Sequence, residues 1–226
     1  MSDTPALRID VFSDIACPWC FIGTRRLASV IESHGAELDV EVRHHPYLLH
    51  PDAPPAGIDL QRMLAQRYGA DPLPMFARVE AAASDAGIAL DLSKQRNAYN
   101  TAAAHTLVRH ALEKGTQAAL VDALFAAYFQ DARNVSDTEV LVDVATRHGF
   151  TADEVRRLLA DEAELAITRR EAQMAAQRGI TGVPFFILDN RYALSGAQPP
   201  EAFRQAIAMA LEYAAQGIRV LSLIHI

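Results

Sequence analysis

The stretch "SDIACPWCFIG", residues 13–23, contains both cysteines of the 226-residue chain and its single tryptophan. Two cysteines separated by two residues can bind a metal, form a structural crosslink or alternate between dithiol and disulfide. The preceding segment "LRIDVFSD", residues 7–14, alternates apolar and polar residues and predicts a strand. A helical pattern begins at Pro18 and ends at Gly35. The pair therefore lies where a strand ends and a helix begins.

This position favours redox chemistry at the cysteine pair. Proline is preferred at the first helical position, so Cys17, directly before Pro18, is expected to be the N-cap. We expect its sulfur to face the free backbone N–H groups of Trp19 and Cys20, which together with the helix dipole stabilise a thiolate. Cys20, one turn further, is then the shielded thiol that resolves a mixed disulfide.

The other two uses of a cysteine pair have less support. A zinc site needs about four ligands, and the chain has no further cysteines. His105 and His110 could complete such a set by number alone, but they are far away in the sequence. A structural disulfide across two intervening residues closes too small a loop to stabilise the protein much. We therefore expect no metal at this site.

The remaining sequence divides into two strand-containing parts and a helical block. Residues 37–49 alternate like a second strand, residues 50–59 are rich in proline and glycine and indicate a linker, and residues 58–179 are helical almost throughout. Thr151, with Glu154 three residues on, matches a capping box. Strands return at residues 183–188 and 191–195, joined by a tight turn at Asp189–Asn190, and a helix follows Pro199–Pro200.

This order predicts an α/β fold in which a large all-helical domain is inserted between the two halves of one sheet. The expected boundaries are residues 1–56 for the first half, 57–165 for the helical insertion and 166–217 for the second half. Residues 221–226, "LSLIHI", are apolar without a pattern, and they can be back-translated into a transposon end used in sequencing libraries. We interpret residues 221–226 as a sequencing or cloning artefact.

Composition and charge exclude several classes of protein. The formal net charge of −7 disfavours binding to a nucleic-acid backbone. No apolar run approaches the roughly 18–20 residues of a membrane span. The first twelve residues lack a basic segment followed by an apolar one, so we expect no signal peptide and a cytoplasmic location. Structural disulfides are uncommon there, which again favours a catalytic or sensing pair.

A second feature near the end of the chain agrees with the cysteine pair. Pro184 stands at the start of a predicted strand, where its ring removes a ladder donor and suits a cis bond that leaves the preceding backbone free to bind a peptide. With this feature, the chain resembles the thioredoxin superfamily and, more closely, the DsbA-like thiol oxidoreductases of the FrnE type. The resemblance rests on "DIACPWCFIG" (14–23), "HPYLLHPDAPPAG" (45–57), "NTAAAH" (100–105) and "GVPFFILDNRYALSGAQ" (182–198).

The resemblance implies a thioredoxin fold interrupted by a helical domain, and a dithiol–disulfide oxidoreductase or isomerase of protein and peptide substrates. It assigns Cys17 as the nucleophile, Cys20 as the resolving cysteine and Pro184 as the cis-proline. The residues expected to support the site or to bind substrate are Pro18, Trp19, Val183, Asn100 and His105. Val183 would pair its backbone with the substrate, and the last two match a helical pattern that lines the cleft.

The expected partners are protein or peptide thiols and disulfides, with glutathione or a thioredoxin-type protein as reductant. No cofactor is expected, glutathione being an optional co-substrate, and the sequence leaves the oligomeric state open. Two other functions stay open. One is a glutathione-dependent isomerase or transferase, as in the related 2-hydroxychromene-2-carboxylate isomerases and kappa-class glutathione transferases, which typically have serine where this chain has Cys17. The other is a redox-sensing or chaperone-like binding protein.

Overall fold

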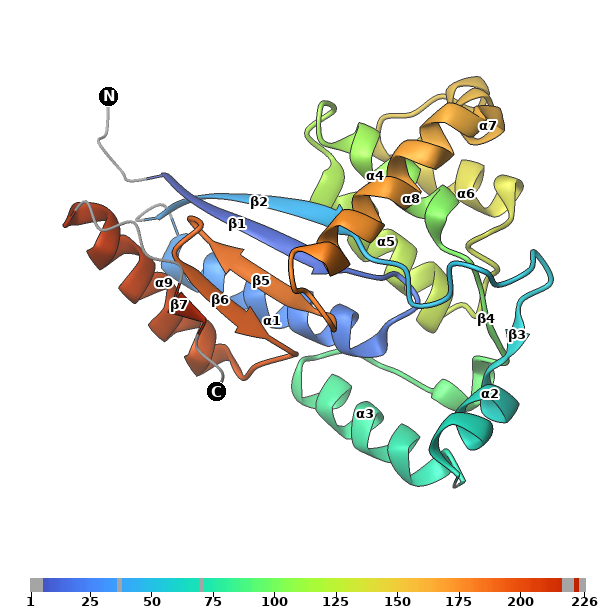
Figure 1. The fold of residues 1–226 in the computed structure, drawn as a ribbon, viewed down its shortest axis with the longest axis horizontal. Coiled ribbons are helices and arrows are strands. Elements are labelled where there is room, and N and C mark those ends of the chain that lie inside the picture. Colours follow the sequence, from blue (N-terminus) through green and yellow to red (C-terminus); the bar gives the residue numbers. More distant parts are fainter. Residues whose placement is uncertain (1–5, 36–37, 70, 217–221, 224–226) are drawn as a thin grey trace.

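A five-stranded sheet organises the two ends of the chain (Figure 1). The structure, a computed structural model, describes residues 6–35, 38–69, 71–216 and 222–223. The strand order is β2-β1-β5-β6-β7, and β1 pairs parallel with β2 and antiparallel with β5. The strands are β1 (Ala6–Ser13), β2 (Asp39–Pro46), β5 (Phe185–Leu188), β6 (Tyr192–Ser195) and β7 (Ser222–Leu223). Because β5 lies directly beside β1, the end of the chain is brought next to the cysteine segment.

Helices cover both faces of this sheet. Helix α1 (Pro18–His34) and helix α9 (Pro200–Ala215) pack on one face, where Ile9 and Val11 of β1 meet Leu27 of α1 and Phe203 of α9. On the other face, the end of α8 (Glu162–Gln177) packs near Phe12. The alternation of apolar side chains along β1 explains why one strand can serve both layers.

The helical insertion gathers at the end of the sheet where β1 leads into α1 (Figure 1). Its helices are α2 (Leu60–Tyr68), α3 (Leu73–Asp85), α4 (Ala102–Ala111), α5 (Gln117–Phe129), α6 (Thr138–Ala145) and α7 (Ala152–Ala160). The first turn of α1 is embedded in this part, because Phe21 stacks on Phe125 of α5 with ring centroids 5.1 Å apart. Both cysteines belong to the same buried cluster as these aromatic rings. The cysteine pair therefore lies between the sheet and the helical insertion.

Most of the predicted elements are present. The α/β fold with a helical insertion is confirmed, and α1 begins at Pro18 as predicted. Thr151 and Glu154 form the predicted capping box. The turn residues Asp189 and Asn190 have φ values of 51° and 54°, as a tight hairpin turn requires.

Some boundaries differ from the prediction. Strand β5 begins at Phe185, so Val183 and Pro184 lie just before it rather than inside it. The segment expected to be helical also contains two-residue strands, β3 (Ile58–Asp59) and β4 (Asn97–Ala98), which are too short for a periodic signal. Helix α8 runs through the proposed boundary between residues 165 and 166.

Two further predictions concern the termini and the membrane. Most of the proposed artefact at residues 221–226 lies outside the described residues, whereas Ser222 and Leu223 pair with β6 as β7. That interpretation stays a prediction. Among the helices of the described ranges, none combines the length and apolar character needed to cross a bilayer.

Candidate active site

The two cysteines occupy different environments although they are one helical turn apart. Cys17 is the N-cap of α1, with Pro18 in the first turn, and its carbonyl accepts a hydrogen bond from the Cys20 N–H at 3.0 Å. Both are free thiols; the Cys17 residue is 5% exposed and Cys20 is fully buried. Cys17 is therefore the more accessible of the two cysteines.

The sulfur of Cys17 does not hydrogen-bond the expected partners. Its side chain makes no capping hydrogen bond, so the predicted contact with the backbone N–H groups of Trp19 and Cys20 is not formed. Instead the thiol donates to the carbonyl oxygen of Val183, with a sulfur–oxygen distance of 3.8 Å. A thiol needs an acceptor for its proton, and the Val183 carbonyl supplies one.

The Val183–Pro184 segment packs directly on α1. The peptide bond between these two residues is cis. A Cβ atom placed on Gly23 of α1 would lie 3.0 Å from Pro184 Cγ and 3.2 Å from the Phe186 ring, closer than ordinary contact. Glycine at position 23 therefore lets the cysteine helix approach the proline, and a glycine inside an otherwise helical pattern is the sequence signal that could have revealed this contact.

Cys20 is poorly suited to losing its proton. Burial raises the pKa of the Cys20 thiol well above its ordinary value, and its hydrogen bond with Cys17 and the negative charge of Asp14 act in the same direction. A backbone hydrogen bond from Asp14 opposes these effects without cancelling them. The pair is thus asymmetric, with an accessible first sulfur and a shielded second one.

Asp14 is a buried carboxylate behind the cysteines. Its Oδ1 accepts hydrogen bonds from the Thr101 hydroxyl at 2.7 Å and the Ala16 N–H at 3.0 Å, and its Oδ2 accepts one from the Leu49 N–H at 2.6 Å. Burial acts to raise the pKa of Asp14, but His105 and these donors outweigh it, so the pKa lies below its ordinary value. Asp14 therefore stays ionised while joining three segments of the chain.

The two predicted cleft residues, His105 of α4 and Asn100 just before this helix, have different neighbours in the structure. His105 is buried beside Asp14, with 3.7 Å between its Nε2 and the Asp14 Oδ1. Asn100 hydrogen-bonds backbone groups: its amide donates to the Pro51 carbonyl and its oxygen accepts from the Ala102 N–H. It helps to cap α4 from the residue before the N-cap, which is Thr101. Its role in substrate binding stays a prediction.

Trp19, the remaining predicted site residue, and the two histidines of β2 differ in how deeply they are buried. Trp19 is partly buried against the cluster that contains both cysteines. On β2, His44 is buried, whereas His45 faces the other side, stacks on Phe12 and contacts the Asp10 carboxylate at 2.7 Å. The alternation of β2 thus directs only His44 toward the helical insertion.

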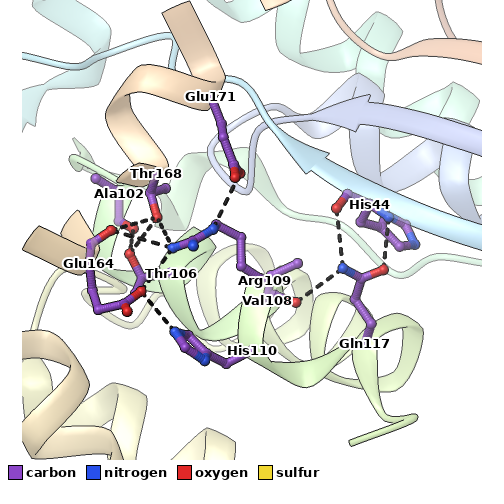
Figure 2. A network of polar contacts seen from close by, with 10 residues as sticks. All are labelled: His44, Ala102, Thr106, Val108, Arg109, His110, Gln117, Glu164, Thr168 and Glu171. Carbon is purple, nitrogen blue, oxygen red and sulfur yellow. Dashed lines mark hydrogen bonds and ion pairs between the residues drawn. The ribbon is translucent and has the colours of Figure 1, made fainter. Parts of the chain in front are cut away.

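A polar network fixes α4, which carries His105, to its neighbours (Figure 2). Arg109 contacts Glu164 and Glu171 of α8 at 3.2 and 3.3 Å, and Thr106 shares a 2.8 Å hydrogen bond with Thr168. On the other side, Gln117 of α5 donates to the Val108 carbonyl of α4 at 3.1 Å and accepts from the His44 N–H of β2 at 2.8 Å. These contacts position the helix that faces Asp14.

Sequence reasoning missed three contributors to the site, namely Thr101, Leu49 and Gly23. Thr101 and Leu49 lie within segments that carried the resemblance, but a single sequence does not show that they meet at Asp14. Asp14 was different: its position three residues before Cys17 already suggested either an influence on that thiol or a turn at the end of the strand, and a carboxylate that is buried there must find donors. Metal binding has no support in the described ranges, where no group of three or more His, Cys, Asp or Glu side chains could hold an ion.

The DSBA-like thioredoxin domain family matches residues 8–208 of the chain. The chain belongs to this family. Among solved structures, a probable DsbA oxidoreductase from Streptomyces coelicolor is 38% identical, with 91% of this chain and 90% of that chain covered and a TM-score of 0.83. Membership supports a thiol–disulfide oxidoreductase activity in general, and DsbA-like oxidoreductases typically use no cofactor.

Two more distant structures share the fold. A 2-hydroxychromene-2-carboxylate isomerase is 15% identical, with 93% of this chain and 99% of that chain covered and a TM-score of 0.69. The cytosolic disulfide reductase DsbM from Pseudomonas aeruginosa, solved with GSH, is 19% identical, with 91% and 99% covered and a TM-score of 0.62. The predicted membership among DsbA-like proteins is therefore confirmed, and the fold is shared with this isomerase.

Proposed function

We propose that this protein is a cytoplasmic oxidoreductase of the FrnE type that exchanges disulfides with protein or peptide substrates through Cys17 and Cys20. The observation that supports this most is the position of the Cys17 sulfur, 3.8 Å from the Val183 carbonyl at the Pro184 segment. This segment lies outside the β1–β5 register, which begins at Phe185. An extended peptide could therefore pair with the Val183 backbone beside the reactive sulfur.

The exchange has two steps when the protein acts as a reductant. The Cys17 thiolate attacks one sulfur of the substrate disulfide, forms a mixed disulfide and releases the other substrate sulfur as a thiolate. Cys20 then attacks the Cys17 sulfur, releases the second substrate thiol and leaves a Cys17–Cys20 disulfide. The same steps in reverse oxidise a substrate dithiol. When a second thiol of the substrate attacks the mixed disulfide instead of Cys20, the substrate leaves with a rearranged disulfide, which is isomerisation. Pro18 and Trp19 shape the surface around Cys17.

Reduction of a peptide disulfide tests this proposal. Cys17→Ser should abolish the reduction, because no other accessible thiol can start the exchange, whereas Cys20→Ser should form mixed disulfides that persist. Mass spectrometry of the protein after incubation with the peptide measures both outcomes. Full peptide reduction by the Cys17→Ser variant would contradict the proposal.

The alternative function is a glutathione-dependent isomerase or transferase. Comparing a peptide disulfide with a glutathione conjugate as substrate distinguishes it from disulfide exchange. The glutathione-dependent chemistry needs only one active position, whereas this site retains a buried second thiol at Cys20. The proposal therefore predicts faster turnover of a peptide disulfide than of a glutathione conjugate. Glutathione or a thioredoxin-type protein would serve as the reductant that regenerates the dithiol.

A further inference from the structure

A buried histidine behind the cysteine pair is left without a role by the two exchange steps. His105 of α4 is 2% exposed, and within the described part of the chain neither of its ring nitrogens has a hydrogen-bond partner. Its Nε2 lies 3.7 Å from the Asp14 Oδ1, which is beyond hydrogen-bond distance. A buried polar group without a partner costs free energy, so its presence here calls for an explanation.

The second exchange step needs a proton acceptor. Only a thiolate attacks a disulfide, but Cys20 is fully buried and its pKa is raised by that burial. At neutral pH the Cys20 proton must therefore move to a neighbouring group as the sulfur attacks. Because Cys20 is fully buried, the groups available to take this proton are polar side chains of the protein interior.

The Asp14 carboxylate is close to Cys20 but has little remaining capacity to accept the proton. Its two oxygens already accept hydrogen bonds from Thr101, Ala16 and Leu49. Burial acts to raise its pKa, yet the nearby donors and His105 lower it overall, which makes the carboxylate a weak base. The backbone of Asp14 hydrogen-bonds Cys20 and its side chain faces His105, so Asp14 connects the two.

The other titratable groups around Asp14 do not balance its charge. Burial lowers the pKa of His44 on β2 to about 3, and it also lowers the pKa of His50 in the loop after β2, although Asp14 opposes the second shift. Burial raises the pKa of Tyr128 on α5, so this phenol stays protonated. A cation formed at His105 would therefore be the one that pairs with the Asp14 carboxylate.

We propose that His105 accepts the proton that Cys20 loses when Cys20 resolves a mixed disulfide, and that Asp14 stabilises the resulting imidazolium. The proton moves from the Cys20 sulfur to a ring nitrogen of His105, and the Cys20 sulfur forms a bond to the Cys17 sulfur. The bond between Cys17 and the substrate sulfur breaks, and the substrate leaves as a thiolate that is reduced while the pair is oxidised. His105 then returns the proton to the leaving thiolate or to solvent. This inference rests on the proposed disulfide exchange.

A small aromatic disulfide, 5,5′-dithiobis(2-nitrobenzoate), separates the two steps in a stopped-flow experiment. The first release of coloured thiolate reports the attack by Cys17, and the second reports the attack by Cys20. In the wild-type protein the second rate should rise by clearly less than tenfold per pH unit between about pH 7 and 9, because an internal base takes the proton. His105→Gln should slow the second phase about 100-fold at neutral pH and leave the first phase nearly unchanged.

The pH profile distinguishes proton transfer from a structural effect. Without the internal base, the second rate of the His105→Gln variant should rise about tenfold per pH unit, following the Cys20 thiolate fraction. His34→Gln is the control, because it removes a histidine in the last turn of α1, where the ring contacts the Val30 carbonyl, and it should leave both phases unchanged. The proposal would be overturned if His105→Gln slowed both phases equally. It would also be overturned if His50→Gln, rather than His105→Gln, selectively slowed the second phase.

The wild-type pH dependence and the use of a non-peptide disulfide both separate the role of His105 from other causes. Circular dichroism shows whether His105→Gln folds. If it does not, the pH dependence of the wild-type second-phase rate is the test: a rate that rises tenfold per pH unit from about pH 6 to 9 excludes an internal base. The reagent is not a peptide. Failure of peptide reduction with a normal second phase would therefore contradict the proposed substrate class and leave the role of His105 standing.

Discussion

Asn100 shows at the scale of one residue how the loop after β2 is held against the candidate active site. Its Nδ2 donates to the Pro51 carbonyl at 2.5 Å and its Oδ1 accepts from the Ala102 N–H at 2.9 Å. The same loop donates the Leu49 N–H to Asp14. Asn100 thus acts on the buried carboxylate through the loop rather than through contact with the cysteines.

Replacing this side chain should affect both stability and the thiols. We expect Asn100→Ala to lower the free energy of unfolding by about 1 kcal/mol, as loss of a helix-capping group does, and to slow the Cys20 phase several-fold. Asn134→Ala is a matched control, because Asn134 makes the same two contacts, to the Pro55 carbonyl and the Ser136 N–H. It should cost similar stability in urea unfolding without changing the thiol kinetics. Equal thiol kinetics in both variants would contradict this role.

At the scale of elements, the contact between α4 and α8 depends on a partly exposed carboxylate (Figure 2). Glu164 accepts from His110 at 2.9 Å and from Arg109 at 3.2 Å. These hydrogen bonds, with His110 contributing most, lower the pKa of Glu164 below its ordinary value. A carboxylate whose pKa is lower in the folded protein adds stability above the unfolded pKa and loses it as the pH falls through the folded pKa.

The pH dependence of this contact can be measured with one substitution. Glu164→Gln should destabilise the protein at pH 7 by less than about 1 kcal/mol, since partly exposed ion pairs contribute little. The difference from the wild type should shrink once the pH falls below the ordinary glutamate value of 4.5. Urea unfolding at several pH values checks this, with Glu113→Gln, which changes an exposed carboxylate after α4, as control. A difference that grows at acid pH would be evidence against the assignment.

Sequence patterns predicted those elements that have a period or a cap. The alternation in β1, the proline at the start of α1 and the turn at Asp189–Asn190 each reflect local chemistry, and each was located within a residue or two. Local patterns do not show which way a side chain points across the chain. Asn100 and His105 belong to one sequence motif, yet one contacts a loop and the other faces Asp14. The Cys17 sulfur likewise contacts a carbonyl distant in sequence rather than its own helix.

At the scale of the whole molecule, one helix belongs to two cores. The first turn of α1 contributes Cys20 and Phe21 to the cluster of the helical insertion, while its later turns contribute Leu27 and Val30 to the cluster beneath the sheet. Because α1 packs in both cores, unfolding of one core removes packing contacts from the other. We therefore expect the sheet and the helical insertion to unfold together.

A core substitution tests this coupling. Phe21 is 1% exposed and stacks on Phe125, so Phe21→Ala should cost about 3–5 kcal/mol. The loss should appear equally in far-ultraviolet circular dichroism and in the fluorescence of Trp19, because both report one cooperative transition. Phe203→Leu, in the cluster beneath the sheet, should shift the same single transition by a smaller amount. Two separate transitions in either variant would show that the two parts unfold independently.

The long sequence separation between the reactive sulfur and the carbonyl that binds its proton has a consequence during synthesis. Cys17 and Val183 are 166 residues apart. A ribosome adds about 5–20 residues per second, so the cysteine segment is synthesised roughly 8–33 s before Val183. For that interval the nascent chain carries two uncovered thiols that oxidants, or other chains on the same messenger RNA, can reach. The growing polypeptide is therefore most vulnerable to crosslinking before its last strands have been translated.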